Sequence, residues 1–146
     1  MDHQSLARVL LALLCGLQGA STAVIDLNKT HATHPGWMGH ARFHVVWQTS
    51  TVVVLSLLEI ALVLMPGPSL NQRFYVSAAL AAAPMLGFFA ALVARRLYRG
   101  TLSDPGGIPP VLWSARGTQL RVDLNLVAEI AGAISLAAIM VIYGWR

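Results

Sequence analysis

Apolar residues fall into four runs of about twenty residues, separated by shorter polar stretches. The runs cover residues 6–25, 44–65, 74–94 and 124–145. A helix of about 20 residues is about 30 Å long, which matches the hydrocarbon core of a bilayer. We therefore predict an all-α integral membrane protein, a four-helix bundle that forms one domain over residues 1–146.

Two of the connections between these runs are long. One is a histidine-rich loop at residues 26–43, and the other is a loop at residues 95–122. The second loop contains an apolar piece, residues 108–113, that ends in a tryptophan and so favours a position in the membrane interface. Between the second and third runs, Pro66-Gly67-Pro68 interrupts any helix, because proline donates no helical hydrogen bond. We expect a tight antiparallel hairpin there.

The first run has two interpretations. Arg8, the apolar residues after it and the small residues Ala20-Ser21-Thr22-Ala23 are also features of a cleavable signal peptide. Retention of this run gives four spans, and cleavage would leave three.

Composition agrees with a membrane protein and indicates its orientation. The chain is 56% hydrophobic and 11% charged, whereas soluble domains have about 25% charged residues. Its ten basic and six acidic residues form no basic patch of the kind that binds nucleic acid.

Most of the basic residues lie on the side of the two long loops. This bias favours a protein of the plasma membrane whose histidine-rich loop lies in the cytoplasm. Lys29, Arg42, Arg95, Arg96, Arg99, Arg116 and Arg121 lie on that side, and Arg8, Arg73 and Arg146 on the other.

The histidines are the first candidates for chemistry. His40 and His44 are four residues apart, so on a helix they share one face and can bind one ion. His31 lies upstream of Pro35-Gly36, where the chain can fold back. We therefore predict His31, His40 and His44 as metal ligands, with a divalent transition metal such as zinc or iron. The alternative is a set of histidines that are hydrogen-bonded at the membrane edge.

Other polar side chains complete the predicted pocket. Arg42 could hold an anionic group, and Trp37 could form an apolar wall. Glu129 lies inside the fourth run, where an ionisable side chain is costly and usually functional. His44 or Glu129 could act as general acid or base, and the alternative is that Glu129 only links helices by hydrogen bonds. The predicted ligand-binding residues are Asp26, Asn28, Trp37, Arg42 and Gln48.

The histidine-rich stretch has a distinctive order of residues. Asn28-x-Thr30-His31 is followed by Pro35-x-Trp37, His40-Ala41-Arg42-Phe43-His44 and Trp47-Gln48. This order resembles a family of small four-span membrane proteins of unknown function, in which asparagine takes the place of His34. The resemblance implies that the first span is retained and that His31, His40 and His44 form the core of the site. It implies no reaction.

Three functions fit these observations. The first is a polar pocket near the cytoplasmic interface that binds a metal ion or a small lipophilic ligand. The second is a membrane-embedded enzyme that acts on a lipid-like substrate through His44 or Glu129. The third is a non-catalytic assembly subunit, in which small residues of the third and fourth spans pack against a partner helix or a second copy in the bilayer.

Overall fold

The computed structural model describes residues 2–103, 106–115 and 117–145, which form four long helices and one pair of strands. The helices are α1 (His3–Asp26), α2 (Gly39–Leu64), α3 (Leu70–Ala94) and α4 (Leu124–Gly144). Each is long and apolar enough to cross a bilayer, which confirms the predicted all-α four-helix membrane bundle. Arg116 and Arg146, which entered the charge count above, lie outside the described residues.

Aspartates begin two of the helices. The Asp2 carboxylate accepts a hydrogen bond from the backbone N–H of Ser5 at 2.7 Å, and Asp123 accepts one from Leu126 at 3.0 Å. Both bonds satisfy N–H groups that have no partner inside the helix. The bond from Ser5 also holds the pKa of the Asp2 carboxyl below its ordinary value.

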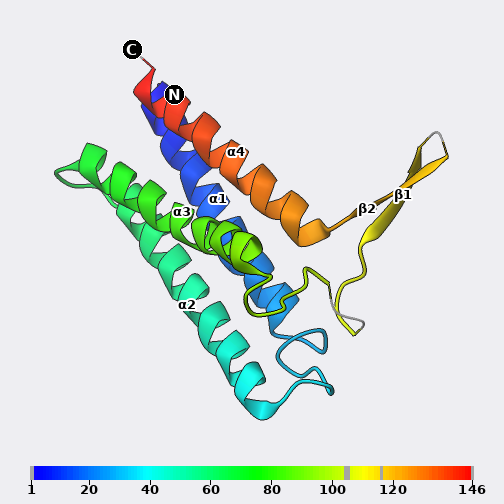
Figure 1. The fold of residues 1–146 in the computed structure, drawn as a ribbon. Helices are drawn as coiled ribbons and strands as arrows, with labels where there is room; N and C mark the ends of the chain where they lie inside the picture. Colours follow the sequence, from blue (N-terminus) through cyan, green and yellow to red (C-terminus); the bar gives the residue numbers. More distant parts are fainter. Residues whose placement is uncertain (1, 104–105, 116, 146) are drawn as a thin grey trace.

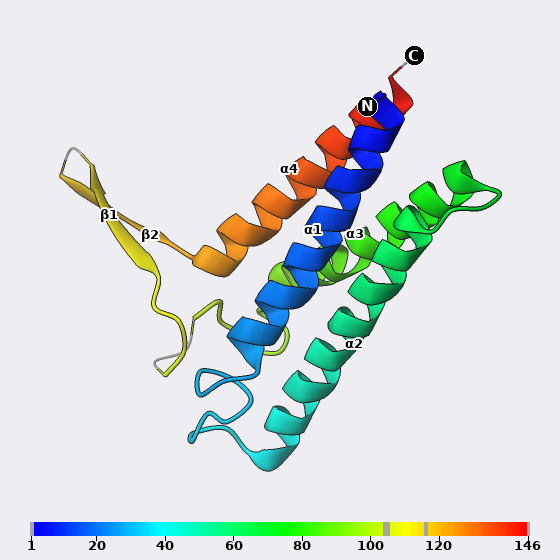
Figure 2. The same ribbon diagram turned by 180° about the vertical axis from the view of Figure 1, so that it is seen from behind.

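Helix α1 is the central element of the bundle. It packs against α2 on one side and α4 on the other, and α3 crosses it (Figures 1 and 2). Its buried residues are Ala7, Leu11, Cys15 and Gly19, one in each helical turn. This row of small and medium side chains gives α1 a continuous inner face, against which α2 and α4 pack, whereas α3 packs mainly against α2.

Two contacts fix α1 against α2. A Cβ atom on Gly19 would lie 2.8 Å from both the Cβ and the Oγ of Ser56, so only glycine allows the two helices to approach this closely. At the other end, the Arg8 guanidinium donates to the Val63 carbonyl, at 2.9 Å from Nε and 2.6 Å from Nη2. That carbonyl lies in the last turn of α2, where helical donors are missing.

A buried polar cluster joins α1, α2 and α3 in the interior. The Glu59 side chain is only 1% exposed and lies next to the Cys15 thiol. The Ser77 hydroxyl donates to the backbone carbonyl of Glu59 at 3.2 Å. Nearby, the Gln18 amide donates to the carbonyl of Ala81, which lies in the helical turn before Pro84. The Ser77 hydroxyl and the Gln18 amide nitrogen therefore bond from helix to helix, whereas Gln18 Oε1 and Glu59 Oε2 are buried without a hydrogen-bond partner.

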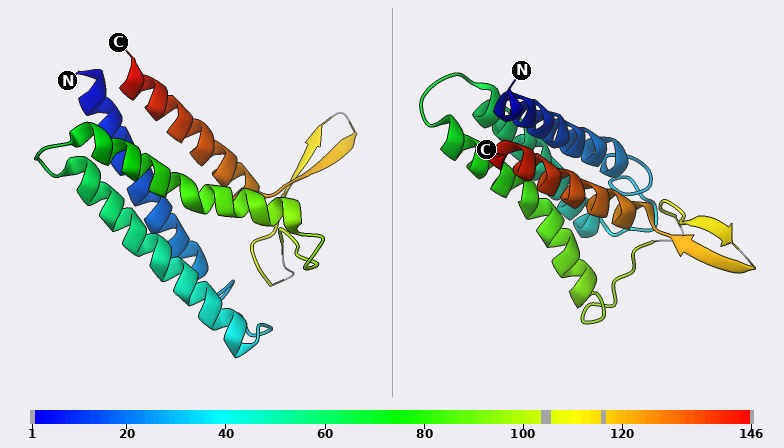
Figure 3. Two further views of the ribbon diagram at one scale, coloured as in Figure 1. Left: turned by 60° about the vertical axis from the view of Figure 1, so that its left-hand side comes forward. Right: turned by 90° about the horizontal axis from the view of Figure 1, so that it is seen from above.

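The connection between α2 and α3 has the predicted form. Gly67 has φ 136° and Ser69 has φ 61°, two left-handed conformations that reverse the chain within a few residues. The two helices pack as an antiparallel hairpin (Figure 3, left).

The small residues of the third and fourth spans differ in burial. Ala78 and Ala81 of α3 are buried, whereas the alanines of α4 at 128, 131, 137 and 138 are exposed.

The long loop contains two strands that we did not predict. β1 (Val111–Ala115) and β2 (Thr118–Val122) pair antiparallel, and Gly117 between them has φ 81°. The apolar piece at residues 108–113 is therefore partly strand. The hairpin stands away from the bundle and runs across the direction of the helices (Figures 1 and 3).

The Gly19 contact generates a stability prediction. Gly19→Ala should lower the thermal unfolding midpoint in detergent, because overpacking a tight contact costs about 1–3 kcal/mol. Gly87→Ala is the matched control, since Gly87 lies inside α3 with no atom within 4 Å of an added Cβ. That control should raise the midpoint slightly through helix propensity. Equal midpoints in the two variants would contradict the close approach.

Candidate functional site

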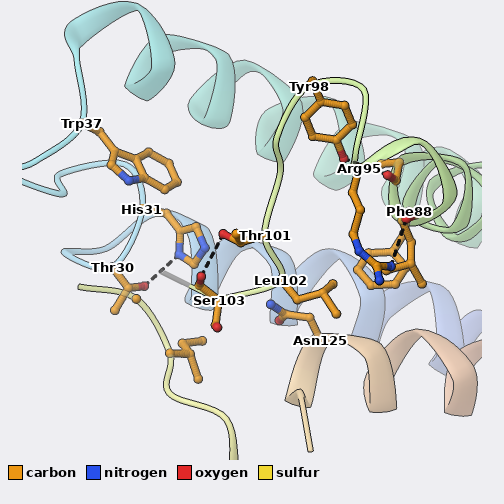
Figure 4. Close-up of a pocket in the computed structure, with 14 residues that line it drawn as sticks. Thr30, His31, Trp37, Phe88, Arg95, Tyr98, Thr101, Leu102, Ser103 and Asn125 are labelled. Atoms are coloured by element: carbon orange, nitrogen blue, oxygen red, sulfur yellow. Dashed lines mark hydrogen bonds between the residues drawn. The ribbon is translucent and has the colours of Figure 1, made fainter. Parts of the chain in front are cut away.

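A cavity of about 380 Å³ lies where the histidine-rich loop, the end of α3 and the start of α4 meet (Figure 4). Its apolar lining includes Phe88, Leu92 and Ile108, and its polar lining includes His31, Arg95 and Asn125. Trp37, Thr30, Tyr98 and residues 101–103 complete most of the wall. An apolar cavity with a few converging polar groups is the usual form of a small-molecule site.

Asn28 shapes the loop that carries His31. Its Nδ2 donates to the Val24 carbonyl at 2.7 Å, and its Oδ1 accepts from the backbone N–H and the hydroxyl of Thr30, each at 2.7 Å. The backbone N–H groups of His31 and Thr33 bond to its carbonyl. Asn28, predicted as a ligand-binding residue, therefore uses its side chain to terminate α1 and turn the chain.

The same contacts orient the ring of His31. Its Nδ1 lies 2.8 Å from the Thr30 hydroxyl, which also contacts Asn28 Oδ1. In the tautomer whose Nδ1 donates to Thr30, Nε2 of the ring is an acceptor. Asp26 lies behind the ring, with Oδ1 3.9 Å from Nδ1 and Oδ2 accepting from the Thr49 hydroxyl at 3.2 Å. Thr30 and Asp26 thus orient the His31 ring from its Nδ1 side, which leaves Nε2 for a hydrogen bond with a ligand.

Trp37 holds two histidines in place. Its ring meets the edge of His31 at 5.5 Å between centroids and lies at the same distance from His34. His34 is buried, and its Nδ1 accepts from the backbone N–H of Gly36 at 3.1 Å. The other ring nitrogen of His34 faces Gly106 so closely that a Cβ atom there would overlap it. His34 therefore ties the histidine-rich loop to the second long loop.

Arg95 and Phe88 lie across the cavity from His31 and Trp37 (Figure 4). One N–H of the Arg95 guanidinium donates to the Leu92 carbonyl at 3.2 Å, in the last turn of α3. The chain then folds back over that turn, because the Tyr98 hydroxyl donates to the Ala91 carbonyl at 2.8 Å. This return places residues 101–103 between the two sides of the cavity.

The predicted site residues separate into three groups. His31 and Trp37 line the cavity, and Asp26 and Asn28 support it from behind. His40, His44, Arg42 and Gln48 lie on the first turns of α2, and Glu129 is half-buried in α4; none of these five lines the cavity. Within the described residues Arg42 has no ion pair, and its Nε is buried without a hydrogen-bond partner.

The structure does not assemble the predicted three-histidine metal site. Nε2 of His40 and Nε2 of His44 are 3.1 Å apart, as expected for residues one helical turn apart. His31 is turned inward by the loop, whereas these two rings are exposed on α2. Across the described ranges, no group of three His, Cys, Asp or Glu side chains could hold a metal ion. Metal binding by His40 and His44 alone stays a prediction.

Two polar residues of the cavity were not predicted as site residues. Arg95 was counted only among the basic residues that indicate the orientation, and Asn125 was not assigned to the site. Both lie at span ends on the side of the histidine-rich loop. That shared level in the membrane was the available signal for grouping them with His31.

Comparison with known proteins adds no further assignment. No protein-family model, no curated protein and no solved structure matches the chain. The similarity of residues 26–48 to a four-span family therefore stays a prediction.

The His34 contact can be tested with Gly106→Ala. The added Cβ should push the second long loop away from His34, because overpacking of about 1–3 kcal/mol has to be relieved by movement. Amide hydrogen exchange in residues 101–110 and 28–37 should then accelerate by roughly tenfold. Gly39→Ala is the control, since an added Cβ there meets no atom within 4 Å. Unchanged exchange in Gly106→Ala would show that the two loops are not coupled.

Proposed function

We propose that this integral membrane protein binds a small lipophilic ligand, specifically a single-chain anionic lipid, in the cavity between the histidine-rich loop, α3 and α4. The observation that carries the proposal is the composition of that cavity. Arg95, His31 and Asn125 are combined there with Phe88, Leu92 and Ile108 at the ends of membrane-spanning helices.

The polar groups suit a lipid head. The Arg95 guanidinium can form charge-assisted hydrogen bonds with a carboxylate or phosphate, and the Asn125 amide can add a donor. In the tautomer whose Nδ1 donates to Thr30, Nε2 of His31 can accept from a hydroxyl group next to that anion. A head that contains both an anion and a hydroxyl would satisfy all three side chains.

The apolar groups suit an acyl chain. Phe88 and Leu92 belong to the last turns of α3, so an acyl chain leaving the cavity past them follows a helix that is apolar enough to span the bilayer. A volume of about 380 Å³ is enough for a head and the first part of a chain. The rest of the chain would remain among the lipids.

Arginine substitutions distinguish specific binding from partition into detergent. Dibromostearate, an anionic long-chain acid whose bromine atoms quench tryptophan, should give saturable quenching of Trp37. Arg95→Gln should weaken this binding by about ten- to a hundredfold, since hydrogen bonds to charged groups contribute about 1.5–3 kcal/mol. Arg96→Gln is the matched control, because Arg96 is adjacent and does not line the cavity.

Two further controls complete this experiment. Trp37→Phe should remove the saturable component of the quenching, and dibromostearyl alcohol should not distinguish Arg95→Gln from Arg96→Gln. Equal affinity of the two arginine variants for the acid would refute the proposed role of Arg95.

We also propose that the cavity faces the cytoplasm. Helices α1 and α3 end, and α2 and α4 begin, at the same end of the bundle (Figure 1), and the excess of Lys and Arg lies at that end. A plasma-membrane location belongs to the same proposal.

Cysteine accessibility tests this orientation. Thr33→Cys should react with a membrane-impermeant maleimide only after the cells are permeabilised, whereas Asn71→Cys should react in intact cells. Both positions are exposed, and the native Cys15 is buried, so the unsubstituted chain is the blank. The reverse labelling pattern would place the histidine-rich loop outside.

A further inference from the structure

The hairpin of β1 and β2 has one apolar and one mainly polar face. Successive side chains of a strand point to opposite sides, so residues paired across the two strands share a face. The register pairs Val111 with Val122 and Trp113 with Leu120, which forms the apolar face. The other face carries Leu112, Ser114, Gln119 and Arg121.

The described part of the chain leaves the apolar face uncovered. Trp113 is 64% exposed and Leu120 is 53% exposed. The hairpin stands clear of all four helices in each view (Figures 1 to 3). An isolated two-stranded hairpin is at best marginally stable in water. These two strands therefore need a second surface that takes up their apolar side chains.

The position of the hairpin in the fold identifies this surface. β2 ends at Val122, and α4, which is apolar enough to cross a bilayer, begins at Leu124. The hairpin leaves the start of α4 sideways, across the direction of the helices (Figures 1 and 3). A segment that runs sideways from the end of a spanning helix follows the surface of the bilayer.

The side chains of the hairpin fit a lipid surface. Tryptophan is enriched at the boundary between acyl chains and headgroups, where Trp113 would lie. Arg121 projects from the opposite face, and its long stem lets the guanidinium reach lipid phosphates. Anionic headgroups attract such a charge.

We propose that the β1–β2 hairpin is a membrane-surface anchor. Its apolar face of Val111, Trp113, Leu120 and Val122 enters the boundary of the acyl chains, and Arg121 contacts lipid phosphate. This anchor goes beyond the lipid-binding cavity and does not depend on its ligand.

Two adjacent residues on opposite faces provide the test. Leu120→Cys and Gln119→Cys are each labelled with an environment-sensitive fluorophore and reconstituted into vesicles of phosphatidylcholine with a minor share of phosphatidylglycerol. The only native cysteine is buried, so the unsubstituted chain serves as the labelling blank. Nitroxide-labelled lipid should quench the probe at 120 several-fold more than the probe at 119, and iodide in the buffer should do the opposite.

Two other quenching results would overturn the proposed membrane anchor. Strong iodide quenching of both probes would show that the hairpin lies in water and would overturn the proposal. A probe at 120 that is shielded from both quenchers would also overturn it, in favour of contact with a second copy or another protein. Added phosphatidylglycerol should increase lipid quenching at 120, and an equal increase in Arg121→Gln would refute the role of Arg121.

Discussion

The close approach of α1 and α2 is the constraint on which the rest of the structure depends. In a bilayer, helices gain little from burying apolar surface against each other, because lipid is equally apolar, so packing and hydrogen bonds must hold them together. Gly19 lets the two backbones approach, and Arg8 bonds to the end of α2. α4 then packs against α1, and α3 packs mainly against α2 and to a smaller extent against α4. The contact between α1 and α2 therefore also fixes the positions of the two helix ends that the histidine-rich loop connects.

The cavity follows from how that loop leaves α1. Asn28 terminates the helix, and this turn directs His31 toward α3 and α4 rather than toward α2. Thr30 and Asp26 then lie at Nδ1 of the imidazole, and the Trp37 ring packs against it. Few of these groups need to touch a ligand, since their effect is to keep one histidine in one orientation. The second long loop closes the other side of the cavity through its contact with His34.

Features set by local spacing could be predicted from the sequence, and features set by distant contacts could not. Four long apolar runs predict four spans, and a separation of four residues predicts that His40 and His44 meet. The direction of His31 depends on side-chain bonds of Asn28, and the position of His34 depends on Gly106, far along the chain; no periodicity reveals either contact. The strands were not predicted because their alternation is short and mixes apolar, polar and charged side chains. Arg95 was used only as an indicator of orientation because a positive charge at a span end usually has that role.

The buried carboxyl of Glu59 has a consequence for how the helices find their relative heights. If α2 slid along α1 by one turn, this side chain would leave the Cys15 thiol and lie beside the neighbouring residues of the α1 row, Leu11 or Gly19. A buried polar side chain without a polar neighbour is destabilising. Glu59 therefore makes bundles that are shifted by one turn unfavourable. A single buried acid can in this way select one arrangement among several that apolar packing alone would allow.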